Sequence, residues 1–327
     1  MHTYGKYFQI HTWGSSHATE LGVVIEGVPA GITLAEDDFI RDLARRKAGA
    51  KGTTPRLETD EPEIVSGLYH GKTTGAPVHI RFRNAAHDSS EYDKRKIPRP
   101  GHADFAANVK FFGHQDDRGG GFFSGRMTIL LVAAGVIAKK IMPRLKISAE
   151  ITHVGGNVNI QQALDEAIQQ KDSLGARIQC KVENLSTGIG EPNFDSVESM
   201  ISHLVFSIPG AKAIAFGSGE RAQEMRGSEF NDVIVNAEGK TKTNHNGGVN
   251  GGITNGNPLV FSVKFKPTSS IAKPQQTFNP ETKQIETLTV KGKHDVCYAL
   301  RAPVIVEAVA AIALVDLFFA QKAKTYE

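Results

Sequence analysis

The sequence has few cysteines and little excess charge, and both shortages exclude classes of protein. Its 327 residues include two cysteines, Cys180 and Cys297, which lie far apart with no metal-like spacing. That count argues against a disulfide framework, offers no zinc site and favours a reduced, cytoplasmic protein. The formal net charge of +3 is too small to indicate a nucleic-acid partner, although local basic clusters could still bind a small polyanion.

The sequence also lacks a leader-like start and has one apolar run of membrane length. The first residues contain no basic segment followed by a continuous apolar run, so no signal peptide is expected. The apolar run, residues 302–320, contains Glu307 and Asp316, each of which would cost about 2.5–3.5 kcal/mol near a bilayer centre. We therefore expect this run to be a buried helix of a soluble protein.

What the chain does contain is a glycine-rich stretch that leads into a wholly apolar segment, residues 118–140, RGGGFFSGRMTILLVAAGVIAKK. Residues 127–142 are apolar on nearly every side, which is typical of a core helix. The three glycines would let the backbone approach a ligand, and Ser124 can serve as the N-cap, so the helix start would form an anion site beside Arg118 and Arg126. An ordinary capped core helix after a flexible loop explains the stretch equally well.

The region before this stretch predicts a strand, a helix, a second strand and a long loop. Residues 21–28 and 78–82 have the composition and alternation of strands. Between them, Thr33 and Glu36 form a capping box for a helix that ends at Gly49. Its apolar face is predicted at Phe39, Ile40, Leu43 and Ala44, and basic residues follow at Arg45, Arg46, Lys47, Lys51 and Arg56. These cations either complement the helix dipole or form a substrate-facing patch.

The long loop, residues 84–121, is polar, contains prolines and glycines, and carries His87, His102 and His114. Long irregular connections in compact domains are often functional, and histidine titrates near neutrality. The loop is therefore a candidate active-site loop, with a disordered insertion as the alternative.

The second half of the chain repeats the order of strand, turn and capped helix. Residues 163–170 predict a helix, residues 176–182 a strand, and Asp195 with Glu198 the start of another helix. This order suggests an internal duplication, although residue identity between the halves is weak. A second glycine loop around residues 244–252 precedes an alternating strand at residues 259–265. Amphipathic strands mixed with helices predict one α+β layered domain, not a doubly wound sheet.

Several long segments, in order along nearly the whole chain, resemble the signatures of the chorismate synthase family. The three longest are GSSHATELGVVIEGVPAG (14–31), RGGGFFSGRMTILLVAAG (118–135) and KGKHDVCYALRAPVIVEAVAAIAL (291–314). Four shorter segments are also similar to family segments: GKTTGAPV (71–78), RPGHADF (99–105), TNHNGGVNGGITNG (243–256) and KPTSSI (266–271).

The resemblance implies a lyase of the shikimate pathway of aromatic amino-acid biosynthesis. Such an enzyme converts 5-enolpyruvylshikimate 3-phosphate to chorismate and phosphate by a 1,4-anti elimination, and it requires reduced FMN. The resemblance further implies a single domain of residues 1–327, folded as a β-α-β sandwich of two antiparallel sheets around long helices. It also implies a homotetramer, with NADPH or an external flavin reductase as the source of electrons.

The same correspondence implies roles for individual residues. His17 would assist the departing phosphate, His102 would maintain the protonation state of the flavin, and Asp295 would help take a proton from flavin N5. Ser16 and Ser124 would support these proton paths. The flavin contacts would be Phe122, Phe123, Ser124, Gly251, Lys266, Pro267, Thr268, Ser269, Ser270 and Lys293, with Pro209 and Gly210 less securely matched. The substrate or NADP would meet Arg46, Lys51, Arg126 and Arg301.

The sequence departs from the common family pattern at Phe122, where an arginine is usual, and at Lys293, where lysine stands before the His-Asp pair instead of arginine. Lysine keeps the charge but loses the bidentate geometry of arginine. Two departures in the expected site leave a second hypothesis open: a flavin- or phosphate-binding protein that keeps the fold without turnover. A nucleic-acid-binding module fits poorly with the small net charge.

Overall fold

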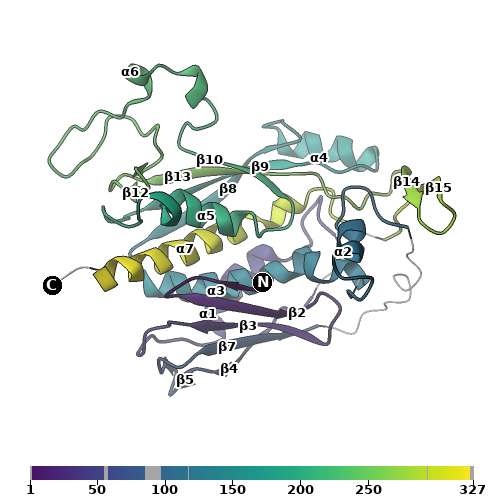
Figure 1. The fold of residues 1–327 in the computed structure, drawn as a ribbon, viewed down its shortest axis with the longest axis horizontal. Coiled ribbons are helices and arrows are strands. Elements are labelled where there is room, and N and C mark those ends of the chain that lie inside the picture. Colours follow the sequence, from purple (N-terminus) through teal and green to yellow (C-terminus); the bar gives the residue numbers. More distant parts are fainter. Residues whose placement is uncertain (1, 55–57, 85–96, 117, 293, 325–327) are drawn as a thin grey trace.

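Two larger antiparallel sheets lie on opposite sides of the long helices (Figure 1). This computed structural model describes residues 2–54, 58–84, 97–116, 118–292 and 294–324. Most buried apolar residues of the sheets and helices belong to one hydrophobic cluster. The protein is therefore of the mixed α and β class expected from its sequence, with antiparallel strands.

In the described part of the chain, the strands form two larger sheets and three two-stranded ones. The five-stranded sheet has the order β1 (Thr3–Tyr4), β2 (Gln9–Gly14), β3 (Glu20–Glu26), β7 (Val78–Arg83), β4 (Pro62–Ser66). The four-stranded sheet has the order β10 (Ala211–Phe216), β13 (Leu259–Phe265), β9 (Ala176–Glu183), β8 (Lys146–Val154). The small pairs are β5 (Leu68–Tyr69) with β6 (Lys72–Thr73), β11 (Val249–Asn250) with β12 (Ile253–Thr254), and β14 (Gln275–Asn279) with β15 (Gln284–Leu288).

The helices are of very different lengths, and the longest lie between the larger sheets (Figure 1). The α-helices are α1 (Asp37–Arg46), α2 (Asp104–Lys110), α3 (Thr128–Ile141), α4 (Ile160–Gln169), α5 (Val197–Val205), α6 (Gly227–Phe230) and α7 (Pro303–Lys324). Short 3-10 turns are η1 (Arg118–Phe123), η2 (Gly125–Met127), η3 (Asn193–Asp195), η4 (Ala222–Glu224) and η5 (Tyr298–Arg301).

The alternation seen in the sequence sets the register of both larger sheets. In β3 and β7 the buried side chains face one another across the ladder, as Val23 opposite Ile80 illustrates. In β9 and β13, Cys180 lies opposite Phe261 in the same way. Because the side chains of a strand alternate between faces, this register places one apolar face of each sheet against the helices. The predicted strands are confirmed.

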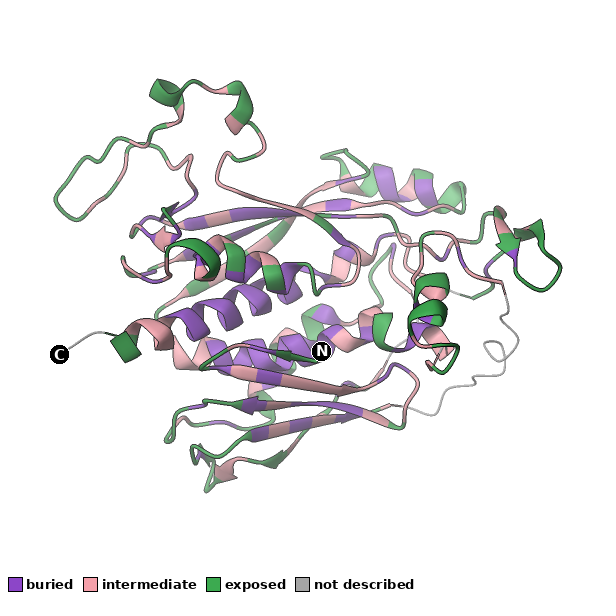
Figure 2. Ribbon diagram, viewed as in Figure 1, coloured by how far each residue is buried: buried purple, intermediate pink, exposed green. Residues whose placement is uncertain are grey.

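Helices α3 and α7 pack against each other in parallel at the centre of the molecule (Figures 1 and 2). A methyl group on Gly135 would lie 2.6 Å from Cα of Ala308, and ten residues earlier a methyl on Gly125 would lie 2.7 Å from the ring of Tyr298. Both segments advance by ten residues between the two contacts, which means that the two helices run in the same direction. Both helices therefore begin at the same end of the molecule.

Helix α7 is long and apolar enough to cross a membrane, but its residues 304–317 are all buried inside the protein, as expected for a core helix. Its two buried acids are both satisfied. Glu307 accepts two hydrogen bonds from Arg45 at 2.7 Å each and one from the Ala149 amide. Asp316 accepts hydrogen bonds from three consecutive backbone amides, those of residues 6–8. Such partners make burial of a charged group tolerable.

Three local predictions are wrong. The predicted capping box of Thr33 and Glu36 does not cap α1: the helix begins at Asp37, Glu36 at the N-cap gives no side-chain cap, and the Asp38 carboxylate accepts a hydrogen bond from the Ala35 amide in the turn before the helix. On the same helix Ile40 is 57% exposed, and Ala44 is exposed too, so the buried face is narrower than predicted. Helix α5 is capped by Ser196 and not by Asp195, since the Ser196 hydroxyl accepts from the Ser199 amide.

The long loop is not structureless, because it contains α2 and most of η1. His87 lies outside the described residues, and the suggested internal duplication stays a prediction.

Replacing Asp316 with alanine tests how far the N-terminal strands depend on α7. Three amides would lose their shared acceptor, so the free energy of unfolding should fall by at least about 3 kcal/mol. Asp316→Asn, which keeps one oxygen, should lose less. Lys324→Ala, an exposed change near the end of α7, should stay within about 0.5 kcal/mol. Urea unfolding of the variants measures this, and similar values for Asp316→Ala and Lys324→Ala would contradict it.

Candidate active site

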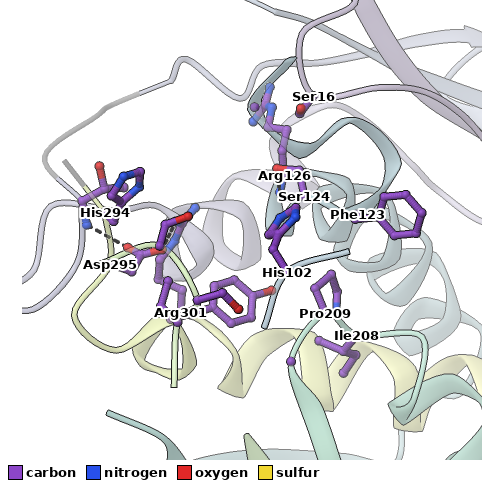
Figure 3. A pocket seen from close by; sticks show the side chains of 18 of the residues that line it. Ser16, His102, Phe123, Ser124, Arg126, Ile208, Pro209, His294, Asp295 and Arg301 are labelled. Carbon is purple, nitrogen blue, oxygen red and sulfur yellow. Dashed lines mark hydrogen bonds and ion pairs between the residues drawn. The ribbon is translucent and has the colours of Figure 1, made fainter. Parts of the chain in front are cut away.

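A cavity of about 1130 Å³ lies at the end of the molecule where α3 and α7 begin (Figure 3). Its walls come from segments far apart in the sequence, which the fold brings together. They are residues 16–17 before β3, the end of α1, residues 99–103, the glycine-rich stretch, residues 206–212 and 266–270, and the turn before α7. The dipoles of the two helices that begin there favour negative charge at this end.

The three glycines of the central stretch make room for two histidines. Gly119, Gly120 and Gly121 all have positive φ, at 59°, 100° and 52°. A methyl group on Gly119 would overlap the imidazole of His17, and one on Gly120 would lie 3.3 Å from Nε2 of His102. The glycines were expected to let the backbone approach a ligand. In the structure they bring it against His17 and His102.

Ser124 joins this loop to the central helix. Its hydroxyl accepts a hydrogen bond from the Arg126 amide at 3.2 Å, so it caps the 3-10 turn η2. Helix α3 begins one turn later, at Thr128. Ser124 and Arg126 line the cavity, whereas Arg118 does not and pairs with Asp116 instead.

His17 is held from behind by its neighbour Ser16. The Ser16 hydroxyl lies 3.1 Å from Nδ1 of His17 and donates to the Arg118 carbonyl at 3.3 Å. The hydroxyl has one proton, which goes to the Arg118 carbonyl. In the contact with Nδ1, the imidazole must therefore donate its N–H to the hydroxyl oxygen. Both side chains line the cavity.

His102 belongs to a network with Asp104 and Arg99. The Asp104 carboxylate lies 2.5 Å from Nδ1 of His102 and accepts hydrogen bonds from Nε and NH2 of Arg99 at 2.7 Å each. Burial raises the pKa of Asp104, but the hydrogen bonds from Arg99 and His102 outweigh it and hold the pKa well below its usual value. Arg99 also donates to the Ser270 hydroxyl at 3.2 Å, which ties this loop to residues 266–270.

Two cavity arginines share one buried carboxylate. Asp60 binds Arg46 through one oxygen, at 2.7 Å, and Arg126 through the other. Its side chain is 1% exposed, and although burial raises the pKa of Asp60, the charges of Arg46 and Arg126 bring the pKa below its usual value. Glu58 adds a 2.5 Å ion pair with NH1 of Arg126. Among the described residues, Nε of Arg46 and NH2 of Arg126 are buried without a hydrogen-bond partner.

Asp295 lies on the side of the cavity opposite Phe123 (Figure 3), between the segments that carry Thr54 and Arg301. One of its oxygens accepts from the Thr54 amide at 2.7 Å, and the other pairs with Arg301 at 3.2 Å. Arg301 in turn donates to the Arg46 carbonyl at 2.9 Å. The aspartate thus keeps both partners while it faces the cavity.

Residues 266–270 form a polar turn at the cavity wall. The Lys266 ammonium donates to the Gly101 carbonyl at 2.5 Å and to the Ser269 hydroxyl at 2.6 Å. Burial and the nearby charge of Lys212 lower the pKa of Lys266. Within the described part of the chain, the Thr268 hydroxyl is buried with no hydrogen-bond partner.

Most of the residues singled out in the sequence meet in this cavity. The cavity is lined by Ser16, His17, Arg46, His102, Phe122, Phe123, Ser124, Arg126, Pro209, Gly210, Lys266, Pro267, Thr268, Ser269, Ser270, Asp295 and Arg301. Lys293 lies outside the described residues. His245 hydrogen-bonds Ser218, which follows β10, at 2.9 Å, and His114 is exposed.

Two predicted contacts are not met within the chain. Gly251 lies in the turn between β11 and β12, which packs near residues 191–196 and does not line the cavity. Lys51 does not line it either, because its side chain turns to Asp165 on α4 and is 53% exposed.

Sequence reasoning missed three charged residues of the cavity wall. Asp60, Glu58 and Arg99 lie in irregular segments without a periodic pattern, so no local signal distinguished them from surface residues. Arg99 does stand at the start of the RPGHADF segment, which was the available clue. Tyr298 was missed as well; it is half-buried at the cavity wall against Gly125, and the desolvation of its hydroxyl raises its pKa.

Replacing Gly119 with alanine should displace His17 and lower turnover by about 100-fold, since small misplacements of reacting groups have effects of that size. Gly71→Ala is the matched control, because Gly71 also has a positive φ, of 70°, but a methyl there meets nothing within 4 Å. Steady-state kinetics and thermal unfolding of both variants compare the effects. Equal losses of activity in the two would mean that backbone strain, and not His17, is responsible.

Comparison with known proteins assigns this arrangement to one family. The sequence profile described as chorismate synthase matches residues 8–319. The chain is 55% identical over 324 residues to a chorismate synthase of Chitinophaga pinensis, covering 98% of each chain, and 40% identical to one of Korarchaeum cryptofilum, covering 96% of each. A crystal structure of a chorismate synthase has the same fold, with a TM-score of 0.75 at 24% identity over 97% of this chain and 93% of the other. The chain therefore belongs to the chorismate synthase family, the lyases that form chorismate in aromatic amino-acid biosynthesis.

Proposed function

We propose that the chain binds 5-enolpyruvylshikimate 3-phosphate in the cavity at the start of α3 and α7, and that His17, His102 and Asp295 divide the proton transfers of its conversion to chorismate. The observation that carries this proposal is the convergence of these three side chains with several buried cations on one cavity of about 1130 Å³. Chemically, the reaction removes a phosphate from carbon 3 and a hydrogen from carbon 6 of the substrate.

The cations of the cavity are suited to this substrate, which carries two carboxylates and a phosphate. Arg46 and Arg126 are fixed by Asp60, so binding requires little reordering of their side chains. The buried N–H groups that lack partners on these two arginines can each donate to an anion. Arg301, held by Asp295 and the Arg46 carbonyl, adds a third fixed charge.

The residues present also fit reduced FMN, the cofactor of the family. The unpartnered Thr268 hydroxyl and Lys266, together with Ser269, Ser270 and Ser124, would hold polar edges of the flavin and its phosphate. Phe123 and Pro209 offer apolar surface for its ring (Figure 3), and Phe122 also lines the cavity. When bound, reduced FMN supplies electron density that helps the phosphate leave.

The chain's own groups would then handle the protons. His17, oriented by Ser16, is placed to donate a proton to the leaving phosphate or to stabilise its charge. Asp295 can accept a proton, because each of its oxygens keeps a second lone pair beside its bond to Thr54 or Arg301. His102, whose Nδ1 lies 2.5 Å from Asp104, would maintain the protonation of the bound flavin. Ser124 would support these transfers from the start of η2.

The alternative, a binding protein without turnover, was suggested by Phe122 and Lys293. Phe122 lines the cavity next to His2, with ring centroids 5.3 Å apart, so an aromatic wall replaces the cation common in the family at that position. Both hypotheses predict flavin binding, and turnover separates them.

Anaerobic assay with reduced FMN and 5-enolpyruvylshikimate 3-phosphate should give phosphate and chorismate in equal amounts. The variant His17→Ala should lower kcat by about 10²–10⁴-fold, the usual contribution of a positioned proton donor, with little change in FMN affinity. His153→Ala is the control, because His153 lies on β8 outside the cavity. Folded wild-type protein without product would refute the enzyme, and equal losses of turnover and FMN affinity would refute the role of His17.

The source of electrons for the flavin is a further part of the proposal. Of the two cations considered for NADPH, Arg46 lines the cavity and is held by Asp60, whereas Lys51 points away toward Asp165. We therefore favour an external flavin reductase as the partner over direct use of NADPH. Turnover with NADPH alone, compared with turnover on chemically reduced FMN, separates the two.

We also propose a cytoplasmic homotetramer with the β-α-β sandwich of the family as its subunit. Cytoplasmic placement is supported by the two free, buried cysteines, of which Cys297 has its pKa raised by burial to about 11 and is therefore unreactive. Assembly is supported by an arm around α6 that projects from the body and carries three consecutive exposed residues, Val233, Ile234 and Val235 (Figure 1). Assembly would also explain the position of Gly251, if it reaches the cavity of a neighbouring subunit.

Placing a charge on the arm should dissociate the tetramer. Ile234→Asp puts a carboxylate on a side chain that is 68% exposed in the single chain, so it should cost little folding stability but much assembly. Val158→Asp, at an exposed valine outside the arm, is the matched control. Light scattering gives the masses, and a tetramer that survives Ile234→Asp would contradict the role of the arm.

A further inference from the structure

We propose that Asp104 is a positioning residue that fixes the tautomer of His102, holding its proton at Nδ1 so that Nε2 faces the glycine loop at the cavity. The inference rests on the function proposed above for His102 and adds a residue to it. Asp104 itself does not line the cavity, so it would act through the imidazole and not on a ligand.

The short contact between Asp104 and His102 determines where the proton lies. Oδ1 of Asp104 is 2.5 Å from Nδ1 of His102. An ionised carboxylate can only accept, so a contact of this length requires a proton on Nδ1. NH2 of Arg99 also lies 3.0 Å from Nδ1, but a guanidinium can only donate. That contact therefore cannot be a hydrogen bond while Nδ1 carries its proton, and NH2 of Arg99 is satisfied instead by Oδ1 of Asp104 at 2.7 Å.

Arg99 keeps the carboxylate ionised and correctly turned. It donates to Oδ2 from its amide at 3.0 Å and from Nε at 2.7 Å, and to Oδ1 from NH2. Its side chain is 5% exposed, and NH1 is anchored on Ser270. Because Arg99 binds both oxygens of Asp104, the carboxylate is held with the free side of Oδ1 facing Nδ1 of His102. A histidine with one nitrogen fixed in this way has a defined tautomer and ring orientation.

The other imidazole nitrogen then has a defined task. Nε2 of His102 lies against Gly120, where even a methyl group would come within 3.3 Å. With Nδ1 protonated, the neutral ring presents a lone pair at Nε2 and can take up or return a proton there. The opposite tautomer would present an N–H at that position and could not accept one.

The variant Asp104→Asn should reverse the tautomer, because the number of Arg99 donors facing each oxygen position decides how the asparagine amide is oriented. If the amide NH2 takes the place of Oδ2, it meets two Arg99 donors, whereas in the place of Oδ1 it meets one. The second orientation is favoured, and it points an N–H at Nδ1 of His102. The imidazole must then accept at Nδ1 and carry its proton at Nε2.

The experiment measures the tautomer directly, without flavin. Nitrogen NMR of protein labelled with [15N]histidine distinguishes protonated from unprotonated Nδ1 and Nε2, and His102→Gln assigns the signals. We expect the Nδ1–H form in the wild type and in Asp104→Glu, and the Nε2–H form in Asp104→Asn. Ser270→Ala, which removes only the anchor of Arg99 NH1, should leave the tautomer unchanged.

Kinetics on the same proteins connects the tautomer to function. Turnover should fall by at least about 100-fold in Asp104→Asn, as for other histidines held in the wrong tautomer, and recover at least partly in Asp104→Glu. A wild-type Nε2–H form, or an Asp104→Asn protein with an unchanged tautomer, overturns the proposal, and the wild-type spectrum decides even if Asp104→Asn does not fold. A reversed tautomer with normal turnover also overturns it. If His102→Gln is fully active as well, it is the function proposed for His102 that has failed.

Discussion

The close parallel packing of α3 and α7 is the constraint on which the rest of the structure depends. Gly135 on α3 has no room for a side chain against Ala308 on α7, and Gly125 has none against Tyr298 in the turns just before the two helices, so the helices and their entry turns are held in register. Because they run in the same direction, both helix starts point to one end of the molecule. The glycine loop, against which His17 and His102 pack, precedes one helix, and Asp295 and Arg301 precede the other. A single packing contact in the core thus assembles the cavity.

The charges around the cavity follow a second constraint, which is that buried charges must be paired. Asp60 holds Arg46 and Arg126, Asp104 holds Arg99, and Asp295 holds Arg301. Each pair lowers the cost of burying an arginine and fixes its direction. The pairing is incomplete, since Arg46 and Arg126 each keep one buried N–H without a partner among the described residues. Those donors cost folding free energy and are available to an anionic ligand, so stability is traded for binding at this point.

The sequence could predict what depends on local pattern and could not predict what depends on long-range arrangement. The alternation in β3, β7 and β13 and the all-round apolar character of α3 and α7 identified the elements, because those patterns report burial directly. The cap of α5 was misplaced by one residue, since Asp195 and Ser196 are both good caps and backbone geometry decides between them. The segment resemblance selected most of the cavity residues. It could not show that Lys51 turns to Asp165, or that Asp60 joins two arginines, because both facts depend on the tertiary fold.

The same charge pattern bears on the departure at Phe122. The described lining of the cavity carries seven cationic side chains and three carboxylates: Arg46, Lys47, Arg99, Arg126, Lys212, Lys266 and Arg301 against Glu58, Asp60 and Asp295. A substrate with two carboxylates and a phosphate therefore meets an excess of positive charge without a cation at residue 122. Phe122 instead stands between this cavity and a smaller one of about 260 Å³ that His2 and His203 help to line. An arginine at that position would add charge beside His2, whereas the phenylalanine offers a flavin ring an apolar contact and keeps the wall between the cavities closed to charge.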